Sequence, residues 1–401
     1  MEPNASQPPQ RIALISGGLA LGGVTTFLIN LAGELVRRGI AVEVFSFEKV
    51  NPLATDFQAQ NIPILCLDEQ RMIFEDRLET VLRRLREFKP TVVIANLGAA
   101  SFEVLRYLPA GIFRIGVIHS DEASQYDMIR HYPPYMDLTA VVSQTMKHRA
   151  TAMPEFARVP VACLPLGVPM CLESSVRDFT APLRILYLGR LTREQKRVQL
   201  FPKILSKLCA SGIPFHWTIA GEGEERGFLE AEMKTDSPHQ TVVFAGSVPY
   251  AKVPALLKQA DIFLLASDYE GLPLSLLEAM GDGLVPVVSD LKSGIPEVVD
   301  ASNGYLVPVN DVAGYARAII HLHGHRDELV AKSAAARARV QKEFSVAGMT
   351  ERWMTAIPTP AALSPVWPQR WKISSPVVAK NPFHFSPPVR ALRRIAARLR
   401  N

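Results

Sequence analysis

Two glutamates stand eight positions apart in the stretch SDYEGLPLSLLEAM, residues 267–280. Glu270 falls in a loop after an apolar run, and Glu278 falls inside the helix that Pro273 is suited to begin. A helix N-terminus offers unpaired backbone N–H groups and a positive dipole end to a phosphate. A carboxylate in the loop beside it can accept hydrogen bonds from sugar hydroxyls, and the helical carboxylate can reach a ribose. The spacing therefore indicates a site for a phosphate joined to a sugar.

Cations follow another apolar run in the stretch YLGRLTREQKR, residues 187–197. Arg190 comes directly after the run, and Lys196 comes six residues later in a loop. A phosphate that leaves with a breaking bond gains negative charge, so cations placed beside it stabilise the transition state more than the ground state. Arg193 and Arg197 are rival cations, which we interpret as solvated charge. The chain contains no D-x-D triplet, and we expect no metal and no cofactor.

The glutamate stretch resembles the signature of the retaining nucleotide-sugar glycosyltransferases of family 4, which have the GT-B fold. That signature reads S-x-x-E-G-x-P-x-x-x-L-E-A-M, and every fixed position of it is matched by residues 267–280. The resemblance implies that Glu270 contacts the donor sugar and that Glu278 contacts the ribose. It also implies that Arg190 and Lys196 stabilise the departing diphosphate in place of a divalent metal.

The same resemblance assigns roles to a histidine and to several glycine turns. His119 follows an apolar run in GVIHSDEAS, and the family places a histidine at this strand end, near the reacting carbon of the donor sugar. The catalytic residues implied are therefore His119, Glu270, Arg190 and Lys196. The expected donor-binding residues are Gly22, Gly23, Gly221, Gly223, Gly246, Val248, Gly271, Leu272, Pro273 and Glu278.

Apolar runs alternate with helical segments in both halves of the chain, which predicts an α/β fold with two Rossmann-like, doubly wound domains facing each other across a cleft. The first unit, Ile12 to Phe47, reads as strand, Gly-rich loop, helix and strand. We expect an N-terminal acceptor-binding domain over residues 1–172 and a nucleotide-sugar-binding domain over 173–357, whose last helix crosses back. An irregular, Pro-rich basic tail then covers 358–401.

Composition points to an intracellular protein with a basic tail. The four cysteines form no C-x-x-C pair, so neither a disulfide framework nor a zinc site is expected. We find no signal peptide and expect a cytoplasmic protein. Residues 361–401 hold eight cations and no acid, although the whole chain is only +5. Residues 389–401 form a basic amphipathic pattern, which fits either peripheral contact with an anionic membrane or a mobile solubilising tail.

We therefore predict transfer of a sugar from a UDP- or GDP-sugar to a saccharide or lipid-linked acceptor, with retention of configuration, in cell-envelope or exopolysaccharide synthesis. Two alternatives remain open. One is a non-catalytic nucleotide-sugar-binding protein, and the other is a nucleotide-sugar epimerase on the same fold. A nucleic-acid partner is not expected. The donor sugar, its base, the acceptor and the oligomeric state are not encoded in any pattern that we identify.

Overall fold

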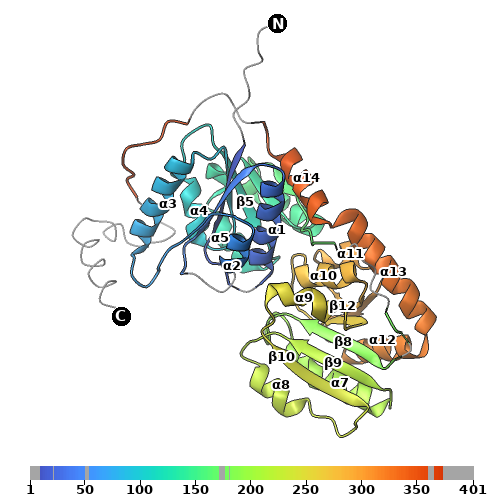
Figure 1. Cartoon of the computed structure of the whole chain (residues 1–401). Coiled ribbons are helices and arrows are strands. Elements are labelled where there is room, and N and C mark those ends of the chain that lie inside the picture. The colour runs from blue at the N-terminus through green and yellow to red at the C-terminus, as the bar shows by residue number, and fades with distance from the viewer. Residues whose placement is uncertain are drawn as a thin grey trace.

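The computed structural model describes residues 10–20, 22–49, 54–170, 177–179, 181–359 and 365–373. Two parallel sheets lie in two separate domains, stacked one above the other in Figure 1. Helices cover both faces of each sheet, which is the arrangement that buries parallel strands on both sides. The α/β prediction with two Rossmann-like domains is confirmed.

The N-terminal sheet has seven parallel strands in the order β3-β2-β1-β4-β5-β6-β7. Its strands are β1 (Arg11–Ser16), β2 (Ala41–Ser46), β3 (Ile64–Cys66), β4 (Val92–Ala95), β5 (Phe113–Ile118), β6 (Leu138–Val141) and β7 (Val161–Cys163). Its helices are α1 (Gly23–Arg37), α2 (Ala54–Ala59), α3 (Phe74–Phe88), α4 (Ala99–Leu105), α5 (Ala123–Ile129) and α6 (Gln144–Ala152), with 3-10 turns η1 (Pro133–Tyr135) and η2 (Pro154–Phe156).

The C-terminal sheet has six parallel strands in the order β10-β9-β8-β11-β12-β13. Its strands are β8 (Leu183–Leu188), β9 (Phe215–Ala220), β10 (Gln240–Gly246), β11 (Ile262–Leu265), β12 (Val285–Asp290) and β13 (Tyr305–Pro308). The helices are α7 (Phe201–Ala210), α8 (Arg226–Glu232), α9 (Val253–Leu257), α10 (Leu274–Asp282), α11 (Ile295–Val298), α12 (Val312–Gly324), α13 (Arg326–Glu343) and α14 (Val346–Ala356), with η3 (Val198–Leu200) and η4 (Tyr250–Lys252).

Both sheets reverse their strand order at a switch point, between β1 and β4 in the first sheet and between β8 and β11 in the second. In open α/β sheets, ligands bind beyond the carboxyl ends of the strands at this point. Of the strands beside it, β4 and β11 are apolar and buried throughout, and they fix the positions of the loops that follow them. Candidate site residues should therefore gather on these loops.

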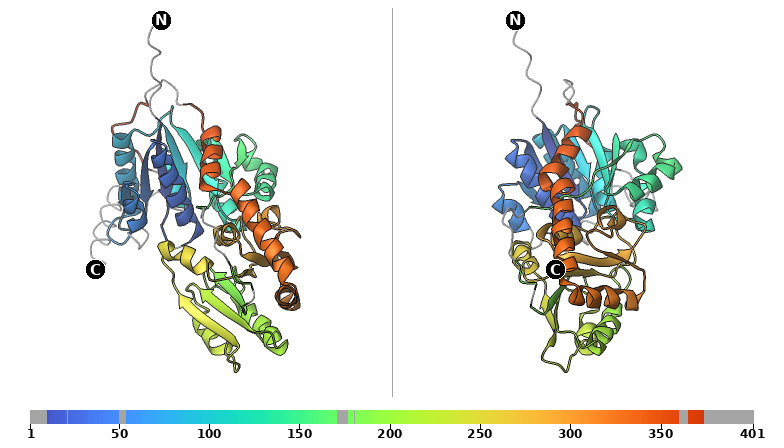
Figure 2. Two further views of the ribbon diagram at one scale, coloured as in Figure 1. Left: turned by 45° about the vertical axis from the view of Figure 1, so that its right-hand side comes forward. Right: turned by 90° about the vertical axis from the view of Figure 1, so that its right-hand side faces the viewer.

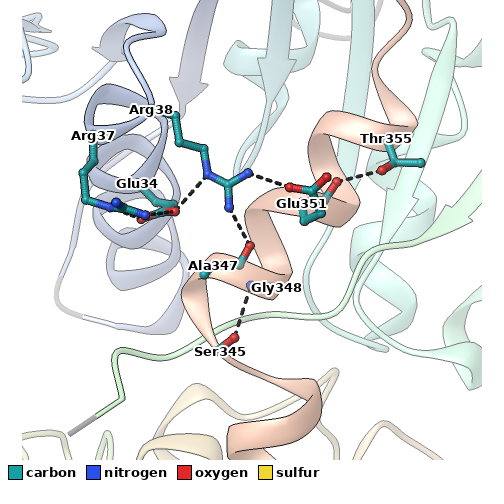
Figure 3. Close-up of polar contacts among 8 residues, drawn as sticks. All are labelled: Glu34, Arg37, Arg38, Ser345, Ala347, Gly348, Glu351 and Thr355. Carbon is teal, nitrogen blue, oxygen red and sulfur yellow. Dashed lines mark hydrogen bonds and ion pairs between the residues drawn. The ribbon is translucent and has the colours of Figure 1, made fainter. Parts of the chain in front are cut away.

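Helix α14 follows α13 and packs on α1 of the N-terminal domain (Figure 2). Trp353 of α14 is buried against the ring of Phe27, with ring centroids 5.9 Å apart. Arg38, just after α1, pairs with Glu351 at 2.8 Å and donates to the carbonyl of Ala347 at 3.0 Å (Figure 3). The last helix therefore connects the C-terminal sheet to the first helix of the chain.

Several sequence predictions fall on residues that the structure does not describe. The predicted domain boundary at 172 is inside 171–176, and the basic amphipathic stretch 389–401 follows the last described residue. Residues 365–373 are described and pack beside α3, where Arg86 lies 5.7 Å from the ring centroid of Trp371. Across the described ranges, helices that combine the length and the apolar character needed to cross a membrane are absent.

Candidate active site

A buried ion pair stands at the switch point of the C-terminal sheet. The Nζ of Lys196 donates to Oε1 of Glu270 at 2.5 Å, and the Ser267 hydroxyl donates to the same oxygen at 2.7 Å. The Lys196 and Glu270 side chains are only 11% and 7% exposed. A buried charge is costly unless it is paired, so each group offsets the cost of burying the other. The structure thus brings together the cation and the carboxylate that the sequence placed 74 residues apart.

Arg190 lies on the same loop as Lys196 and is exposed. Arg190 donates to the side-chain oxygen of Gln195 at 2.6 Å. The backbone carbonyl of Gln195 accepts the backbone N–H of Asp268 at 2.8 Å. Gln195 therefore ties the cationic loop after β8 to the glutamate loop after β11. The rival cation Arg193 pairs with Glu225 at 2.7 Å, away from this pair.

Glu278 lies in the second turn of α10. Pro273 is the N-cap of this helix and precedes its first residue, Leu274. Burial raises the pKa of the Glu278 carboxyl to about 8. Burial and the nearby Glu278 charge raise the pKa of Tyr250. The Tyr250 hydroxyl donates to the Asn30 amide oxygen at 2.8 Å, a bond between the two domains. Glu278 thus occupies a partly enclosed position that favours its protonated form near neutral pH.

His119 directly follows β5 and is held by two neighbours from the N-terminal domain. Its Nε2 lies 2.9 Å from the Asn96 amide oxygen, and its ring meets Phe27 edge-on at 5.1 Å. Asn96 donates from its amide nitrogen to the carbonyls of Ile15 and Ile94 at 3.2 Å, which fixes the amide orientation. Because the Asn96 oxygen can only accept, Nε2 carries the proton and Nδ1 is left as an acceptor.

Burial lowers the pKa of His119 to about 3, so the ring is neutral at physiological pH. A neutral imidazole with an unprotonated Nδ1 can accept a hydrogen bond from a hydroxyl group. It cannot serve as a positive charge beside a phosphate. Positive charge at this site therefore comes from the cations of the C-terminal domain.

Backbone contacts join the two domains beside these residues. A Cβ added at Gly271 would lie 2.2 Å from the carbonyl oxygen of His119, so only glycine permits this approach. Leu272 is buried next to it. A Cβ added at Gly23 would lie 3.7 Å from the Leu274 side chain, at the start of α10. Gly22 precedes α1 at φ +157°. The Gly-rich turn therefore faces the first turn of α10 in the other domain.

Gly221 and Gly223 make a close approach of a different kind. A Cβ at Gly221 would lie 1.8 Å from the carbonyl oxygen of Gly189, and one at Gly223 would lie 2.2 Å from that of Leu191. These two glycines let the loops after β8 and β9 pack backbone to backbone. Gly246 adopts φ +67° at the end of β10, and the half-buried Val248 follows it. Contact of these residues with a nucleotide stays a prediction.

Sequence reasoning missed several residues that complete the site. Asn96 sets the tautomer of His119, Gln195 connects two loops, and Tyr250 reaches across to Asn30. None of these three residues belongs to a sequence motif that we recognised. The only available signal was position, because Asn96 directly follows the strand run ending at residue 95 and Gln195 precedes Lys196.

Family models match both domains of the chain. A model of the family described as Glycosyl transferases group 1 matches residues 182–325, and one described as Glycosyltransferase Family 4 matches residues 21–170. The putative colanic acid biosynthesis glycosyltransferase WcaL of Escherichia coli is 31% identical, over 64% of this chain and 68% of the relative. The amylovoran biosynthesis glycosyltransferase AmsK of Erwinia amylovora is 32% identical, over 58% and 60%.

Solved structures share the fold at low sequence identity. A complex of a TarM mutant from S. aureus with UDP, fondaparinux and alpha-GlcNAc-glycerol superposes with a TM-score of 0.72 at 13% identity, covering 86% of this chain and 99% of that one. Two facing Rossmann-like domains of this kind define the GT-B class. Within that class, the chain belongs to glycosyltransferase family 4, as its glutamate signature predicts.

Proposed function

We propose that this glycosyltransferase moves a sugar from a UDP- or GDP-sugar to a saccharide or lipid-linked acceptor, with retention of anomeric configuration, in exopolysaccharide or cell-envelope synthesis. The observation that carries the proposal is the buried contact of Lys196 with Glu270 at the carboxyl end of the C-terminal sheet. WcaL and AmsK are named for the synthesis of colanic acid and amylovoran, which supports the exopolysaccharide setting.

The C-terminal domain would hold the donor. Lys196 and Arg190 lie where a diphosphate can reach both, and Glu270 offers carboxylate oxygens to sugar hydroxyls. Glu278 would take the ribose. A donor that enters this site draws the Lys196 cation toward its phosphate, and the charge that develops as the C1–O bond breaks strengthens that attraction. The TarM structure contains UDP, which supports a nucleotide in this domain arrangement.

The reaction that fits these groups is a front-face displacement. The bond from C1 to the phosphate oxygen breaks, and the electron pair leaves with the nucleoside diphosphate. The acceptor oxygen bonds to C1 on the same face and passes its proton to the departing phosphate oxygen. His119 would accept a hydrogen bond from the donor sugar through Nδ1. Lys196 and Arg190 would perform the role that a divalent cation has in other glycosyltransferases, so we propose a metal-independent reaction with no cofactor.

A panel of UDP- and GDP-sugars, each incubated with and without EDTA, tests this proposal. We expect release of nucleoside diphosphate from one donor at the same rate in both conditions, and NMR of the product should show the anomeric configuration of the donor. A rate abolished by EDTA and restored by Mn²⁺ would contradict metal independence. Interconversion of the donor sugar without its release would favour an epimerase, and binding without turnover would favour a binding protein.

Peripheral contact with an anionic membrane through residues 389–401 is part of the same proposal, together with a location at the inner face of the membrane. Five arginines in this stretch and no acid supply the attraction. Deletion of residues 374–401 should abolish cosedimentation with vesicles that contain anionic lipid. Unchanged cosedimentation would argue against this anchor.

A further inference from the structure

Glu297 of the C-terminal domain binds the first turn of α6 in the N-terminal domain. Its Oε2 accepts the backbone N–H of Gln144 at 2.9 Å, and its Oε1 accepts the backbone N–H of Thr145 at 2.9 Å. The Thr145 hydroxyl donates to the same Oε1 at 3.1 Å. Three hydrogen bonds to one carboxylate therefore cross between the domains.

These bonds satisfy groups that α6 leaves unpaired. The first N–H groups of a helix have no partner within the helix. The side chain of Ser143, the N-cap of α6, accepts the N–H of Met146, and the first turn of α6 contains no acidic residue of its own. The carboxylate of Glu297 supplies both missing acceptors and places a negative charge at the positive end of the helix dipole. The N-terminal domain thus depends on the other domain for this cap.

The contact between Glu297 and α6 is linked through neighbouring residues to Glu270 and His119. The Thr145 hydroxyl also lies 3.4 Å from the carbonyl of Ser293, and the N–H of Gly294 donates to the carbonyl of Gly271 at 2.7 Å. Gly271 directly follows Glu270 and packs on the backbone of His119. Residues 293–297 therefore connect the α6 terminus to the loop that carries Glu270, at the point where this loop touches the N-terminal domain.

We propose that Glu297 is a positioning residue, which docks the Glu270 loop against the N-terminal domain so that Glu270 and His119 face the same donor sugar. This inference rests on the proposed function for its kinetic consequence only. The residues proposed to hold the nucleotide, Lys196, Arg190 and Glu278, all lie in the C-terminal domain. Loss of the Glu297 bonds therefore slows transfer while the nucleotide still binds.

Two variants of Glu297 should lower the transfer rate to different extents. Glu297→Ala removes all three bonds, and Glu297→Gln keeps the shape but turns one acceptor oxygen into a donor that faces an N–H group. We expect kcat to fall about tenfold or more in Glu297→Ala and less in Glu297→Gln, because misplacing a catalytic group by a small distance has large effects on rate. The dissociation constant of UDP or GDP, measured by calorimetry, should change by less than about twofold.

Glu351→Gln is the matched control. Glu351 also makes a polar contact outside its own helix, an ion pair with Arg38, but its side chain is 69% exposed (Figure 3). It should transfer sugar at the wild-type rate. A loss in Glu351→Gln equal to that in Glu297→Ala would overturn the proposal, as would a wild-type kcat in Glu297→Ala.

Hydrogen exchange gives a readout that needs no turnover. In Glu297→Ala, the amides of residues 143–147 should exchange faster than in wild type, while those of β11 and α10 stay protected. Unchanged exchange at 143–147 would overturn the docking proposal and leave the transferase function standing. A wild-type protein that transfers no sugar from any donor would remove the proposed function, and faster exchange in the variant would still support the docking contact.

Discussion

The two domains contribute different chemistry to the face where they meet. The C-terminal domain presents a buried cation and carboxylate, with an exposed arginine beside them. The N-terminal domain presents a neutral histidine, an amide and a glycine turn. A departing diphosphate is stabilised by positive charge, whereas selection of a sugar and its acceptor depends on the shape of the pocket that binds them. Under the proposed function, this difference assigns donor activation to the C-terminal domain and geometric selection to the N-terminal domain.

The largest expected effect tests the charged domain. Lys196→Ala should reduce transfer by about 10³-fold or more, because the developing phosphate charge loses a buried counter-charge. The change also leaves Glu270 buried without its cation, which destabilises the fold by about 3 kcal/mol. Steady-state kinetics and thermal unfolding measure the two effects.

A double variant separates the loss of activity from the loss of stability. Lys196→Met combined with Glu270→Gln removes both charges and should recover most of the lost unfolding temperature without recovering activity. Arg193→Ala is the control, since Arg193 is a cation of the same loop that pairs with Glu225 instead. Wild-type turnover in Lys196→Ala would show that the charge difference between the domains is irrelevant to catalysis.

A smaller effect is expected in the neutral domain. His119→Ala should lower kcat by about 10- to 100-fold, since it removes an acceptor for the donor sugar but no charge. The activity of wild type should show no inflection from His119 between pH 5 and 8, because its pKa is about 3. A loss equal to that of Lys196→Ala, or a pH profile that disappears in His119→Ala, would contradict the division of roles.

Stability as a function of pH probes Glu278. Its pKa is about 8 in the folded protein, against an ordinary value of 4.5. Between these values the folded state retains a proton that the unfolded chain has released, so raising the pH from about 5 to 8 favours unfolding. Over this range the Tm of wild type should fall relative to that of Glu278→Gln by roughly 3 °C. Parallel Tm curves would show that burial does not perturb this carboxyl.

The smallest effect concerns the tail on the N-terminal domain. Ile373 is buried and Trp371 packs beside Arg86 of α3, so residues 365–373 add apolar burial to that domain. Deletion of 361–401 should lower Tm by roughly 2–4 °C more than deletion of 374–401. Transfer to a soluble acceptor should be the same in both truncations. Equal Tm values would show that the segment contributes no stability.

The sequence predicted the C-terminal domain better than the N-terminal one, and the reason is physical. The IFLL run of β11 in the C-terminal sheet is continuous and apolar, because a strand buried on both faces needs apolar residues throughout. The edge strands β3 and β7 have three residues each and are only half-buried, so they leave no such run. These two strands are defined by their backbone hydrogen bonds to the neighbouring strands β2 and β6. Such bonds join residues far apart in the sequence, so a short stretch of sequence does not predict them.

The site shows the same limit. Glu270 and Lys196 are charged residues in stretches whose pattern could be compared with a known family, so the sequence was enough to single them out. Asn96, Tyr250 and Glu297 act through hydrogen bonds to residues between 23 and 220 positions away. Their residue types are common on any surface, and only the packing of the two domains gives them a role. The site roles themselves stay predictions.

The most direct test of the account compares wild type with Glu270→Ala in one assay. Each protein is incubated with the donor identified from the nucleotide-sugar panel, and release of nucleoside diphosphate is followed while thermal unfolding confirms that both are folded. The account predicts that Glu270→Ala loses about 10³-fold or more of the transfer rate, because the donor sugar loses its carboxylate and Lys196 its partner. Turnover near the wild-type rate would contradict the assignment of this site.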